Sequence, residues 1–144
     1  MKHRCRGMTL LEVAVTMTII GVLAAIALPS YAEYVNRARR GEGRTALTDA
    51  LQQQERFYAA NRRYSEFSMA APNGFATTSG ESPAQAHYVL SAAACAGTTA
   101  QSCVVVSAMP SGSAAPPTGS RFVDSRCGVL TLSTAGVRTP ANCW

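Results

Sequence analysis

The chain has 144 residues and a formal net charge of +5, a length that leaves room for one small domain beyond an N-terminal apolar run. The positive charge is unevenly placed: Lys2, Arg4 and Arg6 all precede that run, and the remainder has ten arginines against eight acidic residues. This remainder carries only +2 from side chains, so the overall charge gives little support for a nucleic-acid partner.

Residues 8–28 read MTLLEVAVTMTIIGVLAAIAL, and the only ionisable side chain among these 21 residues is Glu12. A helix of this length spans about 32 Å, which is enough to cross the hydrocarbon core of a bilayer. The basic segment KHRCRG before it directs the N-terminus to the cytoplasm. A carboxylate in hydrocarbon costs about 2 to 3 kcal/mol, so Glu12 requires a compensating partner or a function.

Three interpretations of this segment differ in where the chain is cut. An ordinary secretory signal would be cleaved near Ser30-Tyr31-Ala32, but its apolar region would span only about 7 to 15 residues. A plain membrane anchor leaves Glu12 without a partner inside the bilayer. Cleavage after Gly7 instead makes Met8 the first residue and places a new α-amino group four residues from Glu12.

The stretch R-G-M-T-L-L-E, followed by Pro29, resembles the type III signal of type IV prepilins. The resemblance implies cleavage between Gly7 and Met8 by a prepilin peptidase, with methylation of the new N-terminus at Met8. It also implies that Glu12 is an assembly residue, neutralised in a filament core by the N-terminal ammonium of a neighbouring subunit. The simpler alternative is a polar residue tolerated near the membrane interface. Pro29, a second assembly position in that family, predicts a kink or local unwinding of the helix at residues 28–30.

Beyond Pro29, apolar residues recur at steps of three and four, which predicts an amphipathic helix over residues 31–61. The apolar stripe consists of Tyr31, Tyr34, Val35, Ala38, Leu47, Ala50, Leu51, Phe57 and Tyr58. The four arginines of RARRGEGR at 37–44 are assigned to the polar face, as solvated side chains or subunit contacts; DNA phosphate binding is the alternative. Gly41 and Gly43 predict a flexible site within this helix.

The remaining chain has the pattern of a loop followed by an antiparallel sheet. Residues 62–86 are rich in turn formers and predict a loop. Strands are expected at 87–92, 103–109 and 128–134, with 121–125 as a further strand, residues 110–120 as an exposed loop and a turn at Ala135-Gly136. Four strands with hairpin connections form an antiparallel sheet that the amphipathic helix can cover, so the expected fold class is α+β.

Of the five cysteines, Cys5 lies in the basic leader and four lie in the C-terminal half. An even number beyond a membrane-targeting segment predicts two disulfides, for which three pairings are possible, and the spacings match no zinc motif. The ending CGVLTLSTAGVRTPANCW is similar to the C-terminus of PilE-like minor pilins. This second resemblance pairs Cys127 with Cys143 and leaves Cys95 with Cys103.

No catalytic arrangement is predicted. His3 lies in the leader, His87 stands alone at the start of an expected strand, and no serine lies in a nucleophile motif. We therefore expect a protein that is not an enzyme and that needs no cofactor and no metal.

The resemblance implies a type IV pilin fold, in which a long N-terminal helix packs on a four-stranded sheet with a disulfide-closed C-terminus. It predicts a leader at 1–7, a membrane and filament-core helix at 8–30, and a globular part at 31–144. The implied function is that of a minor pilin for twitching motility, adhesion or pilus biogenesis. Its partners would be other pilins in a helical filament, the prepilin peptidase and methyltransferase, and the pilus assembly machinery of a Gram-negative inner membrane.

Two other functions stay open. A DNA-uptake pilin similar to ComP would capture extracellular DNA for natural transformation, and Arg121, Arg126 and Arg138 are the expected contacts. A pseudopilin of type II secretion shares the N-terminal signal. Two cysteine pairs near the C-terminus and the lack of an acidic cluster for calcium disfavour that class.

Overall fold

The computed structural model describes residues 8–114 and 119–144, and the side chains of residues 27–30 lie outside that description. The elements follow in the order α1 (Leu10–Asn61), β1 (Tyr88–Ala94), β2 (Val104–Pro110), η1 (Ser111–Ser113), β3 (Leu130–Ser133), β4 (Arg138–Thr139) and η2 (Ala141–Cys143), where η denotes a short 3-10 helix. The chain divides into two compact units, Met1–Arg37 and Ala38–Trp144. We call them the N-terminal and C-terminal units.

Helix α1 is 52 residues long and its backbone is helical throughout. The local unwinding expected near Pro29 is therefore wrong for the backbone. A proline removes one main-chain hydrogen bond, and the helix continues across residue 29 without it. The side chain of Pro29 itself lies outside the described residues. Gly41 and Gly43 are likewise helical.

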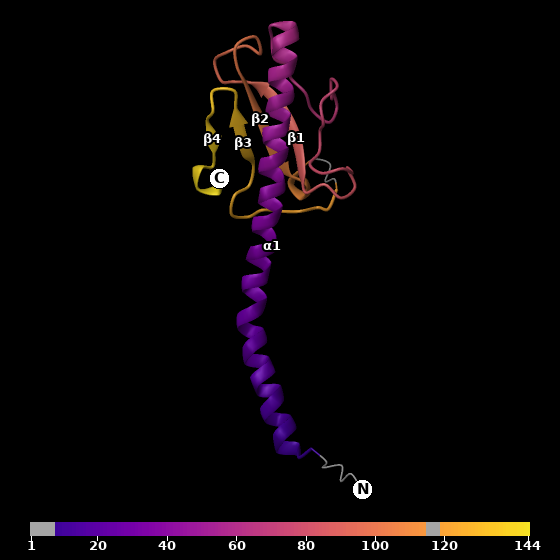
Figure 1. Ribbon diagram of the computed structural model, residues 1–144, viewed down its shortest axis with the longest axis vertical. Helices are drawn as coiled ribbons and strands as arrows, with labels where there is room; N and C mark the ends of the chain where they lie inside the picture. Colours follow the sequence, from indigo (N-terminus) through magenta and orange to yellow (C-terminus); the bar gives the residue numbers. More distant parts are fainter. Residues whose placement is uncertain (1–7, 115–118) are drawn as a thin grey trace, which may run out of the picture. The chain divides into compact units, whose positions relative to one another are not determined.

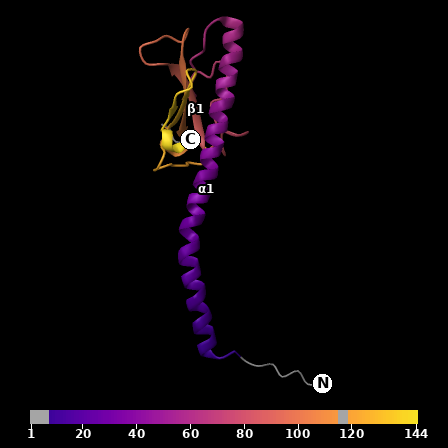
Figure 2. The ribbon, with the colours of Figure 1, turned by 60° about the vertical axis from the view of Figure 1, so that its left-hand side comes forward.

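In the C-terminal unit, four antiparallel strands form one sheet in the order β1-β2-β3-β4, and residues 38–61 of α1 lie across one face of it (Figures 1 and 2). Strands β1 and β2 pair from Tyr88↔Pro110 to Ala94↔Val104. Alternate residues of each strand are buried, as expected for a sheet covered by a helix on one face. The predicted α+β fold with a four-stranded antiparallel sheet is confirmed.

The fourth strand is not the one expected from the sequence. It is β4, paired with β3 after a turn in which the Gly136 N–H donates to the Ser133 carbonyl at 2.9 Å. Gly136 has φ +79°, a conformation that favours glycine, so the turn predicted at this position is confirmed. Residues 121–125 form no strand, because the Asp124 carboxylate accepts the N–H groups of Arg126 and Cys127 and closes a turn there.

The core lies between α1 and the sheet. Its buried residues are Leu47, Ala50, Phe67, Tyr88, Leu90, Ala92, Val106, Ala108, Phe122, Cys127, Leu130, Leu132 and Cys143. The apolar stripe predicted for the helix is therefore confirmed at Leu47 and Ala50. It is wrong at Tyr31 and Tyr34, which are exposed and belong to the N-terminal unit.

The loop between α1 and β1 does more than connect them. Phe67 forms an isolated bridge with Ala92 and Thr78 forms one with Val89, so the loop pairs with the free edge of β1 at two points. Phe67 is buried and stacks on Phe75 with ring centroids 5.0 Å apart, so these two aromatic residues of the loop pack against the core. The loop expected at 110–120 is not exposed at its start, because Pro110 and Ser111 are fully buried.

Candidate functional site

The first candidate site is the apolar start of helix α1. Between Leu10 and Ile26 all large apolar side chains are exposed, from 41% for Val13 to 88% for Leu10. This part of α1 is long and apolar enough to cross a membrane, judged by length and composition alone. An apolar surface of this extent marks a membrane or an assembly interface rather than a solvated helix.

Glu12 has a local role that the sequence analysis missed. Its N–H donates to the Thr9 carbonyl at 3.1 Å and lies 3.3 Å from Thr9 Oγ1, so Thr9 caps the first turn of α1. A threonine followed three residues later by a glutamate is the capping-box pattern, and a carboxylate in the first turn favours the positive end of the helix dipole. Within the described residues the Glu12 carboxylate has no ion-pair partner. Met8 is exposed, and Gly7 lies outside the described residues.

The second candidate site is residues 124–144 at the C-terminus, which a disulfide closes. We call these residues the disulfide-closed region. Cys127 bonds to Cys143 with a Cα–Cα distance of 5.9 Å, and Cys95 bonds to Cys103 across the β1–β2 loop with a Cα–Cα distance of 5.4 Å. Both pairings implied by the resemblance to PilE-like pilins are confirmed. The Cys127–Cys143 disulfide fixes the C-terminal end of the chain beside the turn that follows Asp124.

A buried ion pair joins this region to helix α1. Arg40 Nε lies 2.7 Å from Asp124 Oδ2 and its Nη2 lies 2.9 Å from Oδ1, a two-point contact between side chains that are at most 6% exposed. Burial alone would raise the pKa of Asp124, but the hydrogen bonds from Arg40 and Cys127 outweigh it and hold the pKa below its ordinary value. The carboxylate is therefore ionised at neutral pH.

Two more arginines of the 37–44 segment contact the same region. Arg44 Nε donates to the Cys143 carbonyl at 2.8 Å, and the Arg39 guanidinium lies 5.1 Å from the centre of the Phe122 ring. The assignment of Arg40 and Arg44 to solvent or to subunit contacts is therefore wrong. A signal was present in the sequence, since Arg40, Arg44 and Leu47 recur at steps of four and three on one helix face.

The three arginines predicted as DNA contacts are all exposed. Arg126 and Arg138 lie at the disulfide-closed region, and the Arg138 guanidinium lies 5.3 Å from the centre of the Trp144 ring. Arg121 precedes this region and adopts a left-handed backbone with φ +52°. Arg126 is next to the disulfide-bonded Cys127 in the sequence, and the ring contact places Arg138 against the last residue, Trp144.

His87 is not alone, contrary to the sequence-based expectation. Its Nδ1 lies 2.6 Å from Glu42 Oε2, and the Ser79 hydroxyl donates to Glu42 Oε1. Burial tends to raise the pKa of Glu42, yet the hydrogen bonds from Ser79 and His87 lower it overall. Ser79 bonds to the carboxylate rather than to the imidazole, so these three side chains lack the serine–base contact of a hydrolase.

The helix-on-sheet fold, the apolar N-terminal segment and the C-terminal disulfide define a type IV pilin. The family model of the prokaryotic N-terminal methylation motif matches residues 2–28. A second family model, described as type IV minor pilin ComP, DNA uptake sequence receptor, matches residues 29–131. The chain belongs to this ComP family of type IV minor pilins.

Curated relatives agree with this class. The type IV major pilin protein PilA of Myxococcus xanthus is 39% identical over 77 residues, which is 54% of this chain and 34% of that protein. The type IV major fimbrial protein FimA of Dichelobacter nodosus is 43% identical over 51 residues, and a fimbrial protein of Moraxella nonliquefaciens is 50% identical over 46. Those two matches cover 35% and 32% of this chain and 31% and 29% of the relatives, so the aligned segments span about a third of each relative.

A solved type IV pilin from Shewanella oneidensis is 28% identical and aligns with 75% of this chain and 96% of its own, with a TM-score of 0.48.

Proposed function

We propose that this chain is a minor subunit of a type IV pilus, cut after Gly7, methylated at Met8 and assembled through residues 8–26. The observation that carries the proposal is the long run of exposed apolar side chains interrupted by one carboxylate, Glu12. Before assembly the segment lies in the inner membrane with the C-terminal unit in the periplasm. In the filament a neighbour's N-terminal ammonium pairs with Glu12, which fixes register because an unpaired buried charge is strongly unfavourable.

The test must separate this charge from the capping role of Glu12. Glu12→Gln keeps a side chain that serves in a capping box but removes the charge, and Thr9→Ala removes the cap but keeps the charge. We expect Glu12→Gln and Glu12→Ala to lower the amount in sheared pili at least about tenfold, whereas Thr9→Ala and the exposed control Glu81→Ala leave it near wild type.

Membrane levels of each variant are measured in parallel. Normal recovery of Glu12→Gln in pili would refute the charge-pairing role. Absence of the wild-type chain from pili would refute the function, and mass spectrometry of the mature N-terminus tests the cut after Gly7.

A second function, capture of extracellular DNA, is favoured by the match of the ComP family model to residues 29–131. In this proposal exposed arginines of the disulfide-closed region contact phosphates. Arg40 and Arg44 are not part of that surface, because Arg40 is buried and Arg44 is only half-exposed. Arg126 and Arg138 are the principal candidates, and Arg121 is a third.

A mobility-shift titration with a fragment starting near residue 33 tests DNA binding. Replacing both Arg126 and Arg138 with alanine should weaken binding and lower the salt slope of log K by about 0.9 for each lost phosphate contact. Arg56→Ala, an exposed arginine on α1, is the matched control. No binding of duplex DNA at low salt would rule out this function and leave the pilus role untouched.

A further inference from the structure

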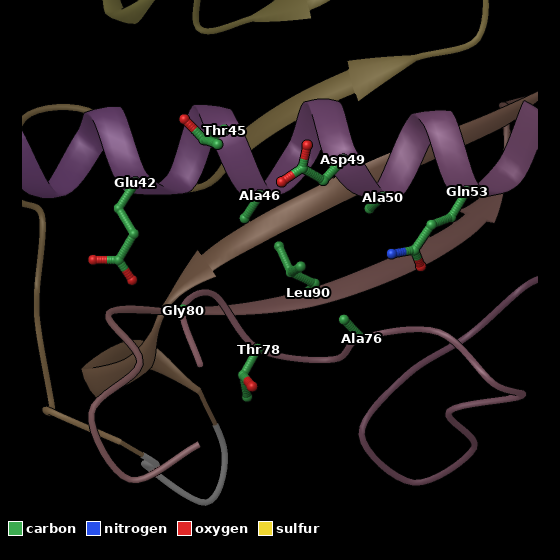
Figure 3. Close-up of a pocket in the computed structure, with 10 residues that line it drawn as sticks. All are labelled: Glu42, Thr45, Ala46, Asp49, Ala50, Gln53, Ala76, Thr78, Gly80 and Leu90. Atoms are coloured by element: carbon green, nitrogen blue, oxygen red, sulfur yellow. The ribbon is translucent and has the colours of Figure 1, made fainter. Parts of the chain in front are cut away.

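A groove lies between residues 42–53 of helix α1 and residues 76–80 of the following loop, and all of it belongs to the C-terminal unit (Figure 3). Its volume is about 420 Å³, within the range of ligand pockets. Three alanines, Ala46, Ala50 and Ala76, line it together with Leu90 of β1. These small side chains leave space over an apolar floor.

The polar groups around this floor are acidic or neutral. Glu42 lines one end and points from the helix toward the loop, Asp49 lies two turns further along α1, and Gln53 is at the far end (Figure 3). The bonds from Ser79 and His87 that lower the pKa of Glu42 keep it ionised at neutral pH. Asp49 is exposed and, within the described residues, has no hydrogen-bond or ion-pair partner. Among the residues that the structure describes, no arginine or lysine lines the groove.

An arginine side chain has the matching chemistry. Its aliphatic stem can lie on the apolar floor while its planar guanidinium donates two parallel hydrogen bonds to a carboxylate. After the leader, this chain contains ten arginines and no lysine, so in a subunit of similar composition arginine is the only side chain with a permanent positive charge. The open groove admits a side chain from another protein surface.

We propose that this groove is a docking site for an arginine side chain of a neighbouring pilin in the filament, with Asp49 as its main carboxylate partner. The inference rests on the proposed function as a pilus subunit. Glu42 supplies a second negative charge whose position is fixed by His87 and Ser79. The groove thus adds a contact between globular parts to the helix contacts of residues 8–26.

The charge of the groove and the space inside it are tested with separate variants of the full chain, expressed in piliated cells. Asp49→Arg reverses the charge and should lower the amount in sheared pili about tenfold, and Asp49→Asn about threefold. Glu55→Arg is the matched control, an exposed acid on the same helix outside the groove. Ala76→Leu, at an exposed groove position, fills the groove without changing charge and should lower incorporation in the same way.

A photo-crosslinking amino acid at position 76 identifies the occupant in assembled pili. We expect an adduct with a second pilin that disappears in Asp49→Arg. Incorporation of Asp49→Arg at the level of Glu55→Arg, or an adduct with something other than a pilin, would overturn the inference. Either result leaves the proposed function standing if the wild type is found in pili, whereas absence of the wild type from pili refutes that function first.

Discussion

The two halves of helix α1 place their apolar side chains in opposite environments. Between Leu10 and Ile26 every large apolar residue is exposed, although this is the more hydrophobic half. Between Ala38 and Asn61 fewer apolar residues occur, yet Leu47 is fully buried and Ala50 is 3% exposed. The second half is covered by its own sheet, and the first has to be covered by a membrane or by other chains.

The second half is also held to the rest of the C-terminal unit by polar contacts of its side chains. Arg40 and Arg44 bond to the C-terminal region, and Gln54, fully buried, exchanges two hydrogen bonds with the backbone of Ser65 at 2.6 and 2.9 Å. Such contacts are specific for one partner, so this half is fixed to a single surface. The following predictions test that difference.

The largest effect is expected from breaking the ion pair between Arg40 and Asp124. Asp124→Ala leaves a buried guanidinium without its carboxylate and should lower the free energy of unfolding of a soluble fragment from residue 33 by about 3 to 5 kcal/mol. Urea denaturation measures this, and the double change Arg40→Met with Asp124→Leu should regain most of the loss. A loss below about 1 kcal/mol in Asp124→Ala would contradict the anchoring role.

Loss of the Cys127–Cys143 disulfide should lower the free energy of unfolding slightly less than loss of the Arg40–Asp124 ion pair. Replacing both cysteines with serine opens a link across 16 positions of the sequence and should cost about 3 kcal/mol in urea denaturation. The Cys95–Cys103 link spans only eight positions and should cost somewhat less. In the full chain, membrane association through residues 8–26 should be unchanged in both variants, since that half needs no contact with the sheet.

Replacing a glycine of α1 with alanine should have a different effect on stability in each half of the helix. A Cβ on Gly43 would lie 2.8 Å from the Tyr88 ring, so Gly43→Ala should destabilise by about 1 to 3 kcal/mol. Gly41 has no neighbour within 4 Å, and Gly41→Ala should stabilise by about 0.5 to 1 kcal/mol. Gly21→Ala, equally uncrowded, should leave thermal unfolding of the C-terminal unit unchanged in detergent. Equal effects at Gly41 and Gly43 would show that Tyr88 does not constrain the helix.

The smallest effect is expected at Tyr88, which is fully buried and whose hydroxyl has no hydrogen-bond partner among the described residues. Tyr88→Phe removes that polar atom and keeps the ring, so stability should stay equal or rise by up to about 1 kcal/mol. Thermal unfolding of the soluble fragment measures it. A loss above 1 kcal/mol would show that the hydroxyl is hydrogen-bonded in solution.

The fold was largely predictable because its signals are local. Alternation and turn residues predict β1, β2 and β3, and the spacing of Leu47 and Ala50 predicts the covered helix face. The strand expected at 121–125 was wrong, since the Asp124 side chain in this short β-rich run accepts the N–H groups of the next residues, Arg126 and Cys127, and bonds to Arg40 of α1. The local pattern of apolar and polar residues does not show which distant residue a side chain will contact.

The candidate sites were predictable to different degrees for the same reason. The N-terminal site depends on neighbouring residues, so its motif is visible in the sequence, including the Thr9 to Glu12 spacing that supports a cap. The pair of Arg40 with Asp124 joins residues 84 positions apart, and the groove joins α1 to residues 76–80. Only the folded chain brings those residues together.

The two bridges that Phe67 and Thr78 form with β1 bear on the behaviour of the protein at high concentration. An unpaired strand edge can recruit another sheet and start aggregation, and subunits of a fibre are necessarily crowded. Covering the β1 edge with the loop, and ending the sheet at the other side with the two-residue strand β4, leaves little edge for such pairing. Contacts between crowded copies are thereby left to side chains, which can discriminate one neighbour from another.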